Sequence, residues 1–117
     1  MQTLIKTNES FLNQYDLPIT FNPIIENIIK ELDNKLLVNP NIFVFGKKCI
    51  QHRAIGFFSN ESVGYKYSGQ IAKAQKLTSD LELLLKYINN NFKADYNGIL
   101  VNKYYDGNDY IGKHSDD

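Results

Sequence analysis

Two pairs of polar residues, each spaced two apart, dominate the last sixteen residues of the chain, which read NKYYDGNDYIGKHSDD. Side chains two apart on an extended strand point to the same side, so Asn102 and Tyr104 form one pair and His114 and Asp116 form another. The turn-forming dipeptide Asp106–Gly107 lies between the two pairs and predicts a change of chain direction. A chain with this segment is therefore expected to place extended strands around a polar site.

The second pair has the chemistry of a metal site. An imidazole and a carboxylate are two of the three ligands in the triad that holds non-haem Fe(II) and leaves positions open for oxygen and a co-substrate. The other histidine, His52, lies far upstream of the sheet strands, and we do not expect it to be the third ligand. Taken alone, His114 and Asp116 fit a solvated polar terminus better than a metal site.

Composition limits the class of protein. The 117 residues suit one small domain or part of a larger one, and a hydrophobic fraction of 43% argues against disorder. The net charge is zero, so only a local patch could attract a nucleic acid. A single cysteine, Cys49, suits an intracellular, reducing compartment, and no apolar run is long enough to suggest a membrane span. Arg53 is the only arginine among thirteen basic residues.

Apolar spacing predicts two helices. The first begins at Asn22–Pro23, an asparagine cap followed by proline, and continues with one apolar face to about Leu37. The second runs from Ser79 to about Asn90, where Ser79 and Glu82 fit a capping box. Both apolar faces are expected to lie in the core.

Short β-prone runs predict the strands. Residues 42–45 and 50–58 are expected to form a hairpin that turns at Gly46–Lys47, and the first twenty residues are expected to be irregular or a short strand. Further strands are predicted at 65–69, 99–104 and 110–116. This order predicts an α+β fold whose two helices buttress one side of an unfinished sheet.

A longer pattern includes both polar pairs. The motif N-x-Y-x-D-G-x-D-x-I-G-x-H-x-D-D fixes ten positions between Asn102 and Asp117, and the upstream runs 44–47 and 65–69 lie at matching distances. In this pattern the chain resembles the N-terminal portion of the AlkB-like 2-oxoglutarate- and Fe(II)-dependent dioxygenases, which dealkylate nucleic acids by oxidation. It is most similar to the animal homologues that act on duplex DNA.

The resemblance implies a role for each matching residue in the co-substrate and metal site. His114 and Asp116 would ligate Fe(II), and Asn102 and Tyr104 would hydrogen-bond 2-oxoglutarate. O2 would be the oxidant, and alkylated DNA or RNA the substrate. Without the resemblance, Asn102 and Tyr104 would fit an ordinary half-buried strand.

The resemblance also implies a substrate surface, formed by Phe45, Gly46, Lys47, Tyr65, Lys66, Tyr67 and Asp117. Phe45, at a hairpin tip with Gly46 and Lys47, would insert into the base stack where a damaged base flips out. Tyr65 and Tyr67 would line the pocket for that base, and Asp117 would contact it. Core packing is the competing interpretation for Phe45 and for both tyrosines. Lys47, Lys48, Arg53, Lys66, Lys73 and Lys76 would contact phosphates or form an ordinary charged surface.

The family pattern continues beyond this sequence. The implied fold is an incomplete double-stranded β-helix, or jelly roll, cut after the His-x-Asp strand, with an N-terminal extension and helix at 1–41, a nucleotide-recognition hairpin region at 42–69, and a helix and first core strands at 78–117. The distal histidine and the 2-oxoglutarate-binding arginine of the family have no counterpart here. We therefore expect the 117-residue chain alone to be inactive.

Three other functions remain open from the sequence. The chain would serve as a non-catalytic nucleic-acid-binding module, or as one half of a split enzyme that a second chain completes. The least favoured alternative is a 2-oxoglutarate enzyme that acts on a small molecule or a protein, because one fold hosts many substrates.

Overall fold

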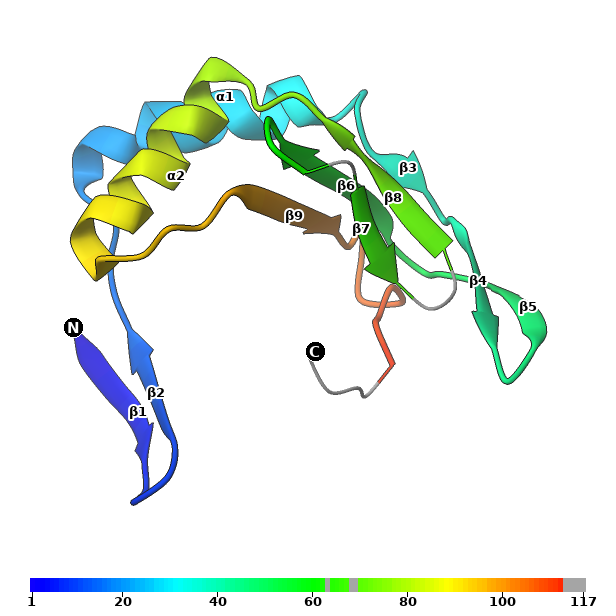
Figure 1. Cartoon of the computed structure of the whole chain (residues 1–117), viewed down its shortest axis with the longest axis horizontal. Coiled ribbons are helices and arrows are strands. Elements are labelled where there is room, and N and C mark those ends of the chain that lie inside the picture. The colour runs from blue at the N-terminus through cyan, green and yellow to red at the C-terminus, as the bar shows by residue number, and fades with distance from the viewer. Residues whose placement is uncertain (63, 68–69, 113–117) are drawn as a thin grey trace.

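The computed structural model of the chain describes residues 1–62, 64–67 and 70–112 (Figure 1). In chain order the elements are β1 (Gln2–Lys6), β2 (Phe11–Gln14), a 3-10 turn η1 (Ile19–Phe21), α1 (Asn22–Leu32), β3 (Leu37–Val38), β4 (Asn41–Val44), β5 (Lys47–Ile50), β6 (Ala54–Ser59), β7 (Gly64–Tyr67), β8 (Gln70–Gln75), α2 (Ser79–Phe92) and β9 (Gly98–Lys103). The described part is thus a mixed α+β fold with more strands than helices and no closed barrel, which confirms the predicted class.

Strand β6 is the centre of the main sheet. Strand β9 pairs antiparallel along its whole length, from Ala54 opposite Lys103 to Ser59 opposite Gly98. On the other edge, β3 pairs antiparallel with its first two residues, and β8 pairs parallel near Phe57 and Phe58. Strand β7 then pairs with β8. Because β6 has neighbours on both edges, all six of its residues are buried.

The β6–β9 register gives the sheet two faces of different chemistry. Phe58 pairs with Ile99, and both side chains pack against the helices. The next pairs along, Phe57 with Leu100 and Ile55 with Asn102, point to the opposite face because side chains alternate along a strand. The helices therefore cover one face. Asn102, the first residue of the polar pair predicted from sequence, lies on the other.

The core lies between that first face and the two helices, which run over the outside of an arch (Figure 1). Its buried members are Ile28 and Leu32 of α1, Leu81 of α2 and Phe58 of β6. The rings of Phe21 and Tyr87 also meet, with their centroids 4.8 Å apart, and join the start of α1 to α2.

Helix α1 is shorter than the sequence suggested. It ends at Leu32, and the prediction that it reaches Leu37 is wrong. The Lys35 amide donates to the Leu32 carbonyl in a turn, and residues 37–38 then pair with β6 as strand β3. A short apolar run can form either part of a helix face or a strand. Residues 37–38 formed a strand because β6 had an edge free to pair with them.

The predicted long strand 50–58 is in fact two strands in two sheets. Strand β5 ends at Ile50 and pairs only with β4, whereas β6 begins at Ala54 and joins the main sheet. Gln51, His52 and Arg53 form the link between them. The hairpin itself was predicted correctly, but its second strand is residues 47–50.

Two other elements differ from the sequence analysis. Strand β8 was not predicted at all, since its mixture of lysine, glutamine and alanine has no strong β signal. The N-cap of α2 is Thr78 rather than Ser79: its hydroxyl accepts a hydrogen bond from the Leu81 amide at 3.2 Å. Glu82 instead accepts a hydrogen bond from Asn60 at 2.9 Å, so the expected capping box is not formed.

At the N-terminal end, β1 and β2 form a separate hairpin that projects from the body (Figure 1). The Tyr15 ring that follows it meets the Phe92 ring edge-on, with centroids 4.8 Å apart. Neither helix in the described ranges is long and apolar enough to cross a membrane.

The first prediction concerns the core. Phe58 is fully buried, so Phe58→Ala should lower the free energy of unfolding by about 3–5 kcal/mol through lost burial and the cavity left behind. Phe11, a strand phenylalanine that is 74% exposed, is the matched control, and Phe11→Ala should cost less than about 1 kcal/mol. Urea unfolding followed by circular dichroism measures both values, and equal losses would contradict the described core.

Candidate functional site

The tip of the β4–β5 hairpin presents an aromatic ring to solvent. Val44 pairs with Lys47, which leaves a two-residue turn of Phe45 and Gly46. Both have positive φ, at 49° and 76°, as a type I′ turn requires. Glycine adopts this conformation freely, but phenylalanine is strained there, and its ring is fully exposed. The competing interpretation of Phe45 as a core residue is therefore wrong.

Two basic residues follow the exposed ring. Lys47 and Lys48 lie on β5 with exposed side chains, close to the tip. Arg53 does not belong to this surface, although the sequence analysis grouped it there. Its side chain is only 2% exposed, so Arg53 is not available to contact phosphates.

Arg53 instead belongs to a buried polar network with Gln51 and Asn102, on the sheet face away from the helices. Its Nε donates to Gln51 Oε1, and its Nη1 donates to Asn102 Oδ1, both at 2.6 Å. Arg53 lies two positions before Ile55, and Ile55 pairs with Asn102. Arg53 is therefore diagonally opposite Asn102 on the neighbouring strand, close enough for its long side chain to reach it. The sole arginine thus connects the linker to the asparagine of the motif.

The middle of the motif forms a tight turn. The Asp106 carboxylate accepts a hydrogen bond from the Asn108 amide at 2.8 Å, and the Asp109 carboxylate accepts one from the Tyr105 amide at the same distance. The Asp109 amide also donates to the Asp106 carbonyl at 3.2 Å. Both acidic side chains of this turn therefore hold the backbone, as aspartate commonly does in turns.

The turn carries the chain back to the linker. The Tyr110 amide donates to the His52 carbonyl at 3.2 Å, and the two rings stack with centroids 4.9 Å apart and an interplanar angle of 19°. A cavity of about 200 Å³ lies here, between the base of the hairpin and residues 110–112, and Gln51 and Arg53 are among its lining residues. His52 thus takes part in ring stacking at this point.

The remaining predicted residues are placed in part. Tyr104 follows β9 and is 42% exposed, while the Tyr65 ring of β7 lies against the Phe57 ring, with centroids 5.7 Å apart. Tyr65 therefore lies over the same sheet face as Asn102. This position fits both interpretations of Tyr65, as part of the base pocket and as a core-packing residue. Lys66 and Tyr67 belong to β7, whose backbone alone is described at these two positions.

The predicted metal ligands lie outside the described residues, as does Asp117. His114 and Asp116 fall within 113–117, which the structure does not describe. Among residues 1–62, 64–67 and 70–112, no three acidic, histidine or cysteine side chains converge as a metal site would require.

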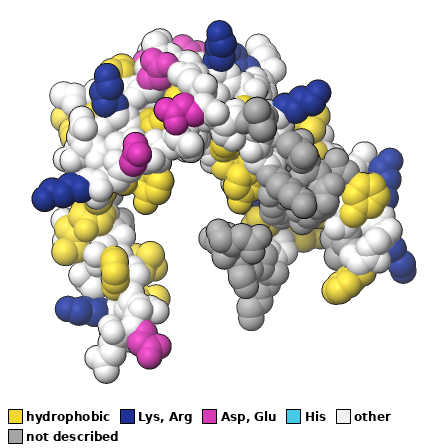
Figure 2. Space-filling view, viewed as in Figure 1, with side chains coloured by type: hydrophobic (Ala, Val, Ile, Leu, Met, Phe, Trp, Pro, Cys, Tyr) yellow, Lys and Arg dark blue, Asp and Glu magenta, His cyan; other side chains and the backbone are white. Residues whose placement is uncertain are grey.

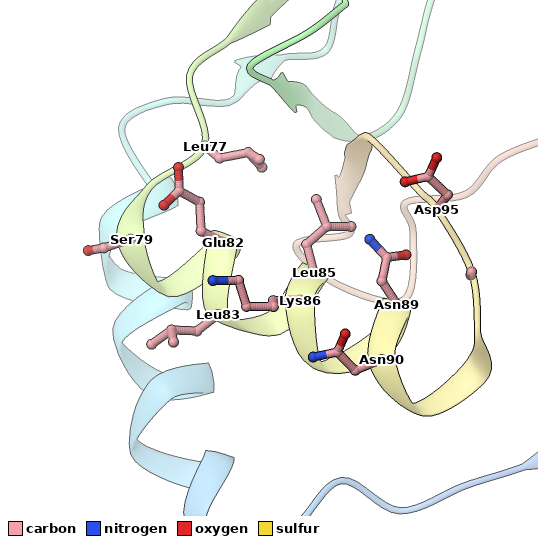
Figure 3. Close-up of a pocket in the computed structure, with 10 residues that line it drawn as sticks. Leu77, Ser79, Glu82, Leu83, Leu85, Lys86, Asn89, Asn90 and Asp95 are labelled. Carbon is pink, nitrogen blue, oxygen red and sulfur yellow. The ribbon is translucent and has the colours of Figure 1, made fainter.

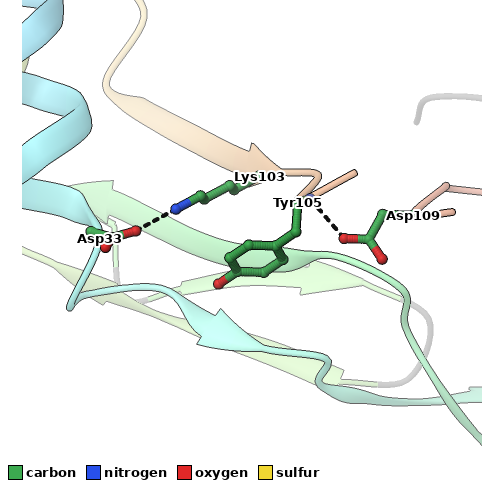
Figure 4. Close-up of polar contacts among 4 residues, drawn as sticks. All are labelled: Asp33, Lys103, Tyr105 and Asp109. Carbon is green, nitrogen blue, oxygen red and sulfur yellow. Dashed lines mark hydrogen bonds and ion pairs between the residues drawn. The ribbon is translucent and has the colours of Figure 1, made fainter. Parts of the chain in front are cut away.

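A salt bridge on the other sheet face holds β9 to α1 (Figure 4). The Lys103 ammonium donates to the Asp33 carboxylate just after α1 and lies 4.8 Å from the centre of the Tyr105 ring. The hydrogen bond to Asp33 raises the pKa of Lys103 above its ordinary value of 10.5. This contact fixes the end of β9 immediately after Asn102.

A larger hollow, of about 680 Å³, lies away from the motif, beside α2 and next to the segment that follows it (Figure 3). Its walls come from α2 itself and from the segments before and after it, including Leu77, Lys86 and Asp95. None of the predicted site residues lines it, so volume alone does not mark the site in this chain.

Sequence reasoning missed the contribution of Gln51 and Arg53. One signal was present: a lone arginine directly before an apolar run that forms a buried strand. A charged side chain beside such a strand must find hydrogen-bond partners when it is buried. The identity of those partners depended on the position of β9.

No protein-family model matches the chain, and no similar protein was found among the curated proteins.

The second prediction tests the salt bridge through its titration. Asp33→Asn should return the pKa of Lys103 toward 10.5, because the hydrogen bond to a carboxylate is what raises it. A raised pKa means that the pair stabilises the fold fully below pH 10.5 and that this contribution is lost as the pH rises through the folded-state pKa of Lys103. NMR titration of the Lys103 side chain measures the change. The control is Asp16→Asn, at an exposed position that precedes α1. An unchanged Lys103 pKa in Asp33→Asn would contradict the pairing.

Proposed function

We propose that this chain contributes the nucleic-acid-recognition hairpin and the co-substrate-binding strand of an AlkB-like dioxygenase that dealkylates DNA or RNA. Phe45 is the observation that carries the proposal. A fully exposed aromatic ring at a strained turn position costs stability and has no packing role in the described chain. Strain of this kind persists where function requires it.

The chemistry of the hairpin tip suits a base stack. An apolar wedge entering a duplex must stand on a rigid support, and a two-residue turn between paired strands supplies one. Lys47 and Lys48 beside the ring would attract the phosphates on either side of the insertion. Insertion would fill the gap that an extruded base leaves, which costs least where the base pair is already weakened.

The opposite end of the site suits a carboxylate co-substrate. Asn102 lies at an exposed position on the sheet face away from the helices, near the exposed Tyr104. An amide and a phenol are both able to donate hydrogen bonds to carboxylate oxygens. These donors fit the 2-oxoglutarate that the motif implies, and the coarse α+β fold is compatible with the front part of a jelly roll.

The described residues would bind and orient rather than carry out the oxidation. Fe(II), held by His114 and Asp116 with a further ligand, would supply the oxidation of the N-alkyl carbon, using 2-oxoglutarate and O2. Asn102 and Tyr104 would orient the co-substrate. Tyr65, whose ring already lies against Phe57, would offer a π-face to the extruded base.

A non-catalytic nucleic-acid-binding module is the second candidate. The same hairpin supports it, because the exposed Phe45 ring and the exposed Lys47 and Lys48 would contact a nucleic acid without any metal or co-substrate. Such a module would bind DNA equally with and without Fe(II) and 2-oxoglutarate. The dioxygenase would instead bind 2-oxoglutarate at Asn102, which a titration can detect.

The third prediction separates function from stability at one residue. Phe45→Asn creates the Asn-Gly pair that type I′ turns favour, so the free energy of unfolding should rise by about 1 kcal/mol. Its affinity for a short duplex with one central mismatch should fall about tenfold or more, because the inserted ring is lost. Urea unfolding and fluorescence anisotropy at low salt measure the two effects.

Two control variants isolate the contribution of the ring. Phe45→Ala removes the ring without relieving the turn, so it should weaken binding without raising stability. Phe11→Ala removes an exposed ring on another hairpin and should leave binding unchanged. If the unaltered chain fails to bind the mismatched duplex at low salt, or binds as tightly with asparagine at position 45, the proposed recognition role is wrong.

A further inference from the structure

We infer that Arg53 is a positioning residue that fixes the orientation of the Asn102 amide and thereby decides what kind of group this site can bind. The inference rests on the proposed function for the identity of the ligand, but its physical basis lies in the hydrogen-bond network of Gln51, Arg53 and Asn102. No role of this kind follows from the motif, which does not extend to Arg53.

The direction of one hydrogen bond carries the argument. A guanidinium has five N–H donors and no acceptor, so only an oxygen can face it. The Asn102 side chain must therefore turn Oδ1 toward Arg53 Nη1, as the 2.6 Å contact shows. This settles the oxygen and nitrogen assignment of the amide, which otherwise depends on its surroundings.

The opposite end of the amide is then fixed as a donor. With Oδ1 held by Arg53, the Nδ2 group points away from the buried network, on a residue whose side chain is exposed. Within the described ranges, no residue accepts a hydrogen bond from Asn102 Nδ2. The site therefore offers two N–H bonds to an acceptor, such as a carboxylate oxygen, and cannot receive a donor there.

Arg53 is itself well fixed for this task. Its side chain is 2% exposed, and a second bond from Nε to Gln51 Oε1 at 2.6 Å holds the guanidinium plane. Its backbone carbonyl also accepts a hydrogen bond from the Asn39 amide at 3.0 Å, beside the β3–β6 pairing. Because the planar Arg53 guanidinium is held at several points, it fixes the direction of its hydrogen bond to the Asn102 amide. A lysine in the same place would act as a point charge and leave the amide freer to rotate.

The variant Asn102→Asp tests the orientation because it replaces only the Nδ2 end. The oxygen facing Arg53 remains and becomes charged, while the donor facing the ligand becomes an acceptor. The unfolding equilibrium constant of the 117-residue chain should therefore fall about tenfold, since a charge-assisted bond is stronger than a neutral one. In the Arg53→Gln background this stabilisation should disappear. If that background does not fold, Arg53→Lys serves in the same cycle, with a smaller stabilisation expected.

A second readout follows the ligand. In the unaltered chain, adding 2-oxoglutarate should shift the NMR signals of the Asn102 side-chain NH2 group. In Arg53→Lys the same shift should require at least about tenfold more 2-oxoglutarate, because the amide is no longer held in one orientation. Succinate, which keeps both carboxylates but lacks the oxo group, tests whether any carboxylate suffices as acceptor.

The outcomes distinguish the two ideas. Stabilisation by Asn102→Asp that depends on Arg53 supports the positioning role. Destabilisation by Asn102→Asp, or a stabilisation that stays the same size when Arg53 is replaced, overturns it. If the Arg53-dependent stabilisation is found but neither 2-oxoglutarate nor succinate shifts the Asn102 signals, Arg53 still orients the amide, and the proposed binding of 2-oxoglutarate at Asn102 is what fails.

Discussion

The pairing of β6 on both edges is the constraint on which the rest of the structure depends. With β9 on one side and β3 and β8 on the other, both edges of β6 are paired, and its side chains alternate between the two faces of the sheet. Phe58 and its neighbours on one face bury against the helices. The other face receives Ile55, Phe57 and, from β9, Asn102. The candidate site exists because this register places a polar residue on the sheet face away from the helices. The space-filling view shows the arch and its hollow side (Figure 2).

The hairpin tip and the motif turn differ in backbone strain. At the hairpin tip, Phe45 occupies a backbone conformation that disfavours its own side chain, and the paired strands on either side enforce it. In the motif turn, by contrast, Asp106 and Asp109 satisfy backbone amides and relieve the local cost of the bend. The motif therefore mixes two kinds of residue, those that shape the chain and those available for binding, and only the structure tells them apart.

Local signals predicted some elements well and failed where neighbours decide. Helix α2 and strand β9 were found within two residues of their ends, because strong apolar periodicity and a clear turn bound them. Residues 33–37 and 50–58 were misassigned, since their apolar residues suit either of two partners. Strand β8 has little intrinsic preference and forms because β6 and β7 offer it hydrogen bonds. Arg53 was assigned to the surface because its charge favours water, whereas the structure buries it with two amide partners.

The sequence by itself determined the α+β class, the two helices, the hairpin with Phe45 at its tip and the strand that carries Asn102. These depend on periodicity and turn chemistry, which act over a few residues. Only the tertiary structure decided that Arg53 lies beneath Asn102 and turns its amide, and that His52 stacks on Tyr110. Such contacts join residues far apart in the sequence, 49 positions for Arg53 and Asn102. Their geometry depends on which strand pairs with which edge. No local pattern encodes that choice, because it is settled by the burial and hydrogen bonding of the whole sheet.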